Sequence, residues 1–242
     1  MKRDRQKLPG QAIESYIASK FDDLATDTSM FPENISADDW QLRAIRQALG
    51  EVTGKKILDI GCGKGKFARP LQAAGAQVLG IDISQALLDV AKSLSRGITY
   101  TLGSATRIPA ASSTFDGATC VEVLEHVPDL DMALKEIVRV LKPGGRLVVI
   151  DKNIAGFHPV WPYPIALHKW QLERKNQWMY PADGPFRERW FTARGLKKNL
   201  LRYFGKVEVH YPERERPILA GLRRLFPWLS YDILWAATKD ED

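Results

Sequence analysis

The stretch KKILDIGCGKGKF, residues 55–67, decides the fold of this chain. Its first six residues are typical of a short buried strand, and the turn that follows places Gly61, Gly63 and Gly65 at alternate positions. Glycines allow a backbone to turn sharply and to approach a ligand closely. The stretch therefore predicts a strand, a ligand-binding turn and the start of a helix.

Strand-like and helix-like segments alternate after this turn. We expect helices over residues 66–75, 84–94, 129–145 and 191–204. We expect further strands over residues 77–83, 98–105, 115–123, 146–152, 206–211 and 230–239. This alternation is typical of right-handed βαβ units that build a mostly parallel sheet.

One domain over residues 1–242 accounts for the pattern. Its expected parts are N-terminal helices lying over the front of the sheet (1–53), a core (54–152), an insertion or lid rich in Pro and Trp (153–190), and C-terminal helix and strand elements (191–242).

Composition narrows the class of protein. No run of about 18 uninterrupted apolar residues occurs, and no apolar run follows the charged start, so neither a transmembrane helix nor a secretory signal is expected. Cys62 and Cys120 have no partner at metal-ligand spacing and are expected to be reduced core thiols. These features indicate a cytoplasmic protein.

Charge and tryptophan concentrate in the last third of the chain. Residues 1–151 hold 19 Lys+Arg and 19 Asp+Glu, whereas residues 152–242 hold 16 and 10. Six of the seven Trp lie there: Trp161, Trp170, Trp178, Trp190, Trp228 and Trp235. Segments 157–180 and 213–229 therefore suit peripheral contact with an anionic membrane, although the same aromatics suit an internally packed lid. Stacking on RNA is a weaker alternative, because no recognised RNA-binding module is present.

Two carboxylates lie beside the glycine turn, and the first of them selects the ligand. Asp59 precedes Gly61 by two residues, where it would repel a pyrophosphate but suit a ligand that carries ammonium and sulfonium charges. Asp82 ends the second expected strand and suits the hydroxyls of a ribose. The spacing Gly-x-Gly-x-Gly also departs from the dinucleotide pattern Gly-x-Gly-x-x-Gly. The residues thus favour S-adenosylmethionine over NAD.

Four stretches, ILDIGCGKG, GIDIS, FDGATCVEVLEHVPD and LKPGGRLVV, resemble the successive motifs of class I S-adenosylmethionine-dependent methyltransferases. The resemblance covers about residues 40–152. It implies an α/β, Rossmann-like fold: a seven-stranded, mostly parallel sheet in the order 3-2-1-4-5-7-6, with helices on both faces and the last strand antiparallel.

The resemblance also implies a set of cofactor-binding residues. Asp59, Gly61 and Gly63 would hold the methionine moiety and Asp82 the ribose. At the end of the third strand the family often has an Asp near adenine, whereas this chain has Ser104. The full implied set is Arg43, Asp59, Gly61, Cys62, Gly63, Asp82, Ile83, Ser104, Ala105 and Val121.

The stretch VEVLEHVPD, residues 121–129, carries Glu122, Glu125 and His126 at positions that share one face of a helix. It is similar to the O-methyltransferases of ubiquinone biosynthesis, as is WQLRAIR, which places Arg43 near the cofactor carboxylate. That similarity implies Glu122, Glu125 and His126 as candidate ligands of a divalent cation such as Mg²⁺. Two other interpretations stay open: His126 or Glu122 as a general base acting on a phenol or enol, or a polar helix start.

Methyl transfer needs little side-chain chemistry, because the sulfonium is already activated and the enzyme mainly aligns the acceptor. The sequence predicts O-methylation of a small or lipid-like acceptor of the quinone-precursor type. RNA or protein methylation and a non-catalytic S-adenosylmethionine-binding module are the alternatives, and an NAD(P)-dependent oxidoreductase is less favoured.

Overall fold

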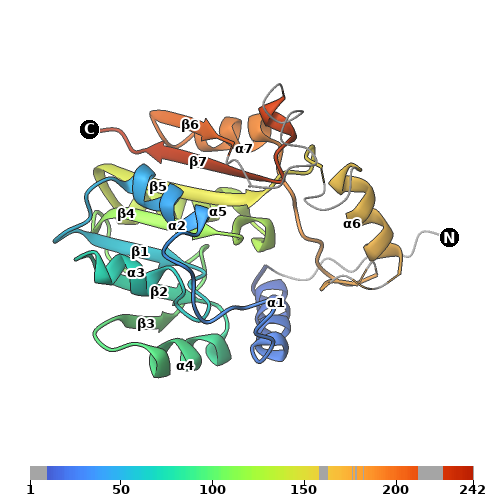
Figure 1. Cartoon of the computed structure of the whole chain (residues 1–242), viewed down its shortest axis with the longest axis horizontal. Helices are drawn as coiled ribbons and strands as arrows, with labels where there is room; N and C mark the ends of the chain where they lie inside the picture. Colours follow the sequence, from blue (N-terminus) through green and yellow to red (C-terminus); the bar gives the residue numbers. More distant parts are fainter. Residues whose placement is uncertain are drawn as a thin grey trace.

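A seven-stranded sheet forms the centre of the molecule (Figure 1). The computed structural model describes residues 10–157, 163–175, 177, 179–181, 183–211 and 226–241. The strands are β1 (Lys56–Ile60), β2 (Gln77–Asp82), β3 (Thr99–Leu102), β4 (Phe115–Val121), β5 (Leu141–Lys152), β6 (Lys206–His210) and β7 (Asp232–Thr238). Their order is β3-β2-β1-β4-β5-β7-β6, and only β7 runs antiparallel to its neighbours in this described sheet. The predicted order is confirmed.

Helices cover both faces of the sheet. One face packs against α5 (Leu130–Val140) and α7 (Ala193–Leu200), and the other against α2 (Trp40–Leu49), α3 (Ala68–Ala73) and α4 (Gln85–Leu94). Ser84 caps α4, since its side chain accepts a bond from the N–H of Leu87. The two-faced core explains why the strands are continuously apolar rather than alternating.

The centre of β5 shows this most directly. Leu147 and Val149 belong to the core beside α5 and α7, whereas Val148 and Ile150 belong to the core beside α2 and α3. All four side chains are 0% exposed. The rigid sheet therefore fixes the position of the residues at the ends of its strands.

The expected helix over residues 129–145 is shorter than predicted. Asp129 caps α5, which ends at Val140, and β5 already begins at Leu141. Pro143 has no N–H for a helix, and Gly144 adopts a positive φ of 70°. The Pro-Gly-Gly segment is thus the irregular start of the strand, where the register with β4 shifts.

Two helices stand outside the layers. α2 covers the sheet as expected, but α1 (Gly10–Leu24) lies across the carboxyl ends of the strands, and α6 (Ile165–Arg174) lies beyond it (Figure 1).

No helix in the described part of the chain has the length and apolarity that crossing a bilayer requires. Cys62 and Cys120 are buried and unbridged, as predicted. Trp161, Trp178 and residues 212–225 fall outside the described residues.

Candidate active site

A cavity of about 400 Å³ opens at the carboxyl edge of the sheet. The last residues of four strands line it: Ile60 of β1, Asp82 of β2, Val121 of β4 and Lys152 of β5. Ligands of open α/β sheets bind at this edge, where the strand order reverses. Residues of α1 and of the segment between α6 and α7 close the other side.

The glycine turn forms the floor of the cavity. Gly61 and Gly63 have φ values of 65° and 52°, in the left-handed region that favours glycine. A Cβ on Gly61 would lie 2.2 Å from Cγ2 of Val123, whereas one on Gly63 would meet open space. Between them, Cys62 donates its N–H to the carbonyl of Ile81 at 2.9 Å, which ties the turn to β2. Burial raises the pKa of the Cys62 thiol, which is therefore inert.

Asp82 holds the turn from the neighbouring strand. Its Oδ2 accepts a bond from the N–H of Gly63 at 2.8 Å, and its Oδ1 accepts one from the N–H of Ser84 at 2.9 Å. Burial raises the pKa of this carboxyl, while the backbone N–H groups of Ser84 and Gly63 oppose the shift. A carboxylate so oriented, lining the cavity, fits the hydroxyls of a ribose.

The structure brings most of the implied cofactor residues together. Eight of them line the cavity: Gly61, Cys62, Gly63, Asp82, Ile83, Ser104, Ala105 and Val121. A glycine turn beside a carboxylate that fits a ribose, with apolar walls, fits S-adenosylmethionine, the cofactor that the sequence predicts.

Two implied residues lie elsewhere. Asp59 is buried beneath the turn and accepts a bond from Thr119 Oγ1 at 2.7 Å, and burial raises the pKa of Asp59 to about 7. Arg43 is exposed on α2 and donates to the backbone carbonyl of Asp38. Because Leu42 and Ile45 face the sheet, Arg43 points away from it, so the placement of Arg43 at the cofactor is corrected.

The expectation that Glu122, Glu125 and His126 share a helix face is wrong. Glu122 has a positive φ of 56°, and only a single 3₁₀ turn, η1 (Leu124–His126), follows it. Glu122 and His126 line the cavity, but Glu125 does not and is 0% exposed. Glu125 instead pairs with the ammonium group of Lys152.

His126 lies between an aromatic side and a carboxylate side. Its Nδ1 is 3.1 Å from the hydroxyl of Tyr180, and its ring contacts Phe21 edge-on at 5.1 Å between centroids. Its Nε2 is 3.5 Å from Oε1 of Glu125 and 3.6 Å from Oε1 of Glu188. Burial lowers the pKa of His126 to about 4, although Glu188 opposes this shift. The imidazole is therefore neutral near pH 7, and a pKa this low makes it a weak base.

Sequence reasoning missed Lys152 and Glu188, which also line the cavity. Burial disfavours the charge of Lys152, but Glu122, Glu125 and Glu188 outweigh burial and hold the pKa of Lys152 well above its usual value. Burial also opposes the charge of Glu188, whose pKa is lowered by His126, Lys152 and Lys169. Lys152 could have been predicted, because it stands at the end of an expected strand, where ligands of such sheets bind. Glu188 belongs to no recognisable motif.

The structure does not bring Glu122, Glu125 and His126 together as one set of metal ligands. Glu125, His126 and Glu188 each bring one ligand atom within 4.8 Å of the others, and Glu122 is not in this group. Two ammonium groups already face these carboxylates, because Lys152 pairs with Glu125 and Lys169 Nζ lies 3.7 Å from Glu188 Oε2. A dication here would be repelled by both lysines. The donors present therefore do not fit a divalent cation.

Known proteins resemble this chain in sequence and in fold. A family model described as "Methyltransferase domain" matches residues 58–149. The demethylmenaquinone methyltransferase of Streptomyces avermitilis is 35% identical over 148 residues, which are 60% of this chain and 62% of that protein. This chain thus covers less than two thirds of that relative's length.

Two further proteins extend the comparison. The ubiquinone biosynthesis O-methyltransferase of Alkalilimnicola ehrlichii is 40% identical over 180 residues, which are 66% of this chain and 71% of that protein. The crystal structure of an S-adenosylmethionine-dependent methyltransferase from Thermotoga maritima, a possible histamine N-methyltransferase, shares the fold with a TM-score of 0.67 at 20% identity. That similarity covers 92% of this chain and 99% of the other.

Proposed function

The chain belongs to the S-adenosylmethionine-dependent methyltransferases, and we propose that it methylates an oxygen of a small or lipid-like acceptor of the quinone-precursor type. The observation that carries this proposal is the neutral His126, which lines the cavity beside Lys152 and Glu188. The names of the relatives, which include a ubiquinone biosynthesis O-methyltransferase, support the acceptor class.

The far end of the cavity suits an aromatic acceptor. Phe21, Phe31, Leu172 and Met179 supply apolar wall from α1, from the loop after it, and from the segment around α6. The polar groups near this wall include His126 of η1, Lys152 of β5 and Glu188 of the segment before α7. A flat apolar ring with one or two hydroxyls matches such a surface.

We infer that His126 takes the proton of the acceptor hydroxyl and that Lys152 stabilises the oxygen anion that remains. S-adenosylmethionine supplies a methyl group that is already activated on its sulfonium. In the tautomer that carries its proton on Nδ1, His126 donates to the hydroxyl of Tyr180, and Nε2 is left to take a hydroxyl proton from the acceptor. The carboxylate of Glu188, whose Oε1 lies 3.6 Å from Nε2, favours the imidazolium that forms.

His126 alone is too weak a base. A phenol has a pKa of about 10, so transfer to an imidazole with a pKa of about 4 costs roughly 8 kcal/mol. The ammonium of Lys152, held in the cavity wall by Glu125, offsets part of this cost by stabilising the phenolate oxygen. Aligning that oxygen with the methyl group is the remaining contribution of the cavity.

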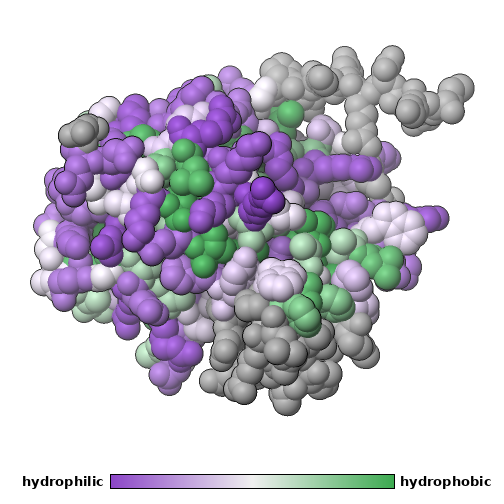
Figure 2. All heavy atoms as spheres, turned by 90° about the horizontal axis from the view of Figure 1, so that it is seen from above, coloured by the Kyte–Doolittle hydropathy of each residue, from purple (hydrophilic) through white to green (hydrophobic). Residues whose placement is uncertain are grey.

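We also propose peripheral contact with a membrane that carries the acceptor. Leu167 and Trp170 of α6 are 45% and 51% exposed, and Trp228 of η3 (Pro227–Leu229) is 50% exposed. Arg174 lies over the ring of Trp170 at 4.7 Å, which combines a cation with an aromatic side chain. Figure 2 shows hydrophobic side chains gathered in small patches on an otherwise hydrophilic face. Such groups favour the headgroup region of a bilayer.

An acceptor screen with methyl-labelled cofactor tests the proposed function. The panel comprises phenolic quinone precursors, phospholipids and RNA, each with wild-type protein and with His126→Ala. We expect label on the phenolic precursors alone, and far less of it with His126→Ala than with wild-type protein. Label on RNA, or equal labelling by His126→Ala, would contradict the proposal.

A further inference from the structure

We propose that Glu14 of α1 accepts a hydrogen bond from the adenine amino group of the cofactor, and so couples cofactor binding to the seating of α1 over the cavity. The proposal rests on S-adenosylmethionine as the cofactor. It goes beyond the proposed function because it assigns recognition to a helix outside the layers of the sheet.

Glu14 lies at the end of β3. Its Oε1 accepts bonds from Ser104 Oγ at 2.7 Å and from Thr106 Oγ1 at 2.5 Å. Glu14 and Ser104 both line the cavity. A carboxylate therefore stands beside Ser104, but it comes from a helix 90 residues earlier in the chain rather than from the strand end itself.

The adenine of the cofactor would reach this carboxylate. Gly103 donates its N–H to the carbonyl of Asp82 at 2.9 Å, so the segment after β3 lies directly beside the ribose-binding residue. Ile83 also lines the cavity there and offers an apolar surface for a base. A purine attached to a ribose on Asp82 thus extends toward Ser104 and Glu14.

The bonding capacity of Glu14 is incomplete. Both of its bonds end on Oε1, and none from the described residues reaches Oε2. A carboxylate only accepts hydrogen bonds, and the exocyclic amino group of adenine donates them. The 6-oxo group of hypoxanthine accepts instead, so Glu14 should distinguish adenine from hypoxanthine.

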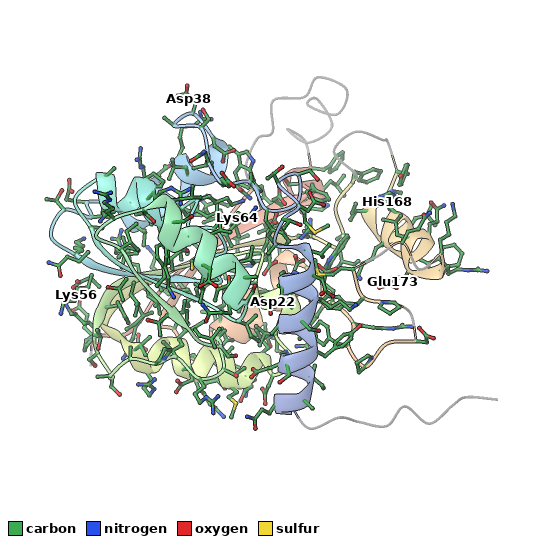
Figure 3. The ribbon with its side chains drawn as sticks, turned by 90° about the horizontal axis from the view of Figure 1, so that it is seen from below. Asp22, Asp38, Lys56, Lys64, His168 and Glu173 are labelled. Carbon is green, nitrogen blue, oxygen red and sulfur yellow. The ribbon has the colours of Figure 1, made fainter. Side chains whose placement is uncertain are left out.

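The same contact would hold α1 in place. Glu14, Ile17 and Phe21 lie on one face of α1 and all line the cavity. Near the C-terminal end of α1, Asp22 (labelled in Figure 3) accepts bonds from Ser84 Oγ at 2.5 Å and from the N–H of Ala86 at 3.1 Å. Phe21 contacts His126, so a cofactor that fixes α1 also completes the acceptor side. This arrangement predicts that the cofactor binds before the acceptor.

Calorimetry with S-adenosylhomocysteine and S-inosylhomocysteine tests the proposal. We expect wild-type protein to bind the adenosyl compound about tenfold to a hundredfold more tightly, as a charge-assisted hydrogen bond allows. Glu14→Gln should reduce this preference to within a few-fold, because its amide can also donate to the 6-oxo group. The control Asp22→Asn weakens the seating of α1 without lining the cavity, and should weaken both compounds equally.

Hydrogen exchange of the α1 amides supplies a second measurement. S-adenosylhomocysteine should slow exchange over residues 10–24 in wild-type protein, and less so in Glu14→Gln. A wild-type preference near one, or an unchanged preference in Glu14→Gln, would overturn the assignment of Glu14. Failure of wild-type protein to bind either compound would overturn the cofactor itself, and with it this proposal.

Discussion

Replacing Lys152 with Met should destabilise the protein in a pH-dependent way. The side chain of Glu125 is 0% exposed and that of Lys152 is 15% exposed, so the substitution leaves a buried carboxylate without its cation. Breaking a buried pair by removing one partner costs about 3–5 kcal/mol. Burial raises the pKa of Glu125, whereas the ammonium group of Lys152 lowers it. Without Lys152 that pKa rises further, so Glu125 can escape part of this cost by taking up a proton.

The sign of the pH dependence follows from this proton. In Lys152→Met the folded state retains a proton on Glu125 that the unfolded chain releases above a pKa of about 4.3. The folded state then binds more protons than the unfolded state, so its stability falls as pH rises, by up to about 1.4 kcal/mol per pH unit. The free-energy difference from wild type should therefore be smaller at pH 5.5 than at pH 8.

Urea denaturation at several pH values measures this difference. The double variant Glu125→Gln/Lys152→Met removes both charges of the pair and should recover part of the loss, with a weaker dependence on pH than the single variant. A loss in Lys152→Met that does not change between pH 5.5 and pH 8 would refute the buried pair. So would a double variant that is no more stable than the single one.

Three further predictions concern the turn and the polar cluster. Gly61→Ala should cost about 2–5 kcal/mol in urea denaturation, since it combines a left-handed conformation with a clash against Val123, and Gly63→Ala should cost only about 1–2 kcal/mol; equal losses would contradict the clash. His126→Ala should lower kcat about a hundredfold or more, while the affinity for S-adenosylhomocysteine, measured by calorimetry, should change little; a parallel loss of affinity would point to a structural role. The kcat of wild-type protein should not fall through titration of His126 until the pH approaches 4. Strong chelation should leave turnover unchanged in a labelled-methyl assay, because lysines neutralise the carboxylates; lost activity that Mg²⁺ restores would contradict this.

The sheet and its order could be predicted because the decisive signals are local. The Gly61 turn, the apolar strands and the capped helices each act within a few residues of sequence. The end of α5 was misjudged because residues 141–145 belong to β5, whose pairing with β4 cannot be read from the segment alone.

Only part of the candidate site could be predicted from the sequence. Asp82 and the glycine turn could be recognised from their spacing in the sequence. The left-handed backbone of Glu122, which breaks the expected helix face, is not indicated by the residues around it. Glu14 and Glu188 act through partners far away in the chain, namely Ser104 and the pair of His126 and Lys152. Contacts of that kind arise from packing and leave no spacing to recognise.

The most direct test of O-methylation is the chemical position of the transferred methyl group. Wild-type protein would be incubated with S-adenosylmethionine labelled with carbon-13 at the methyl group and with a phenolic quinone precursor, and the product examined by NMR. We predict a methoxy resonance coupled to the aromatic ring. A methyl group on a ring carbon, or the absence of any labelled product from protein that binds the cofactor, would contradict the account.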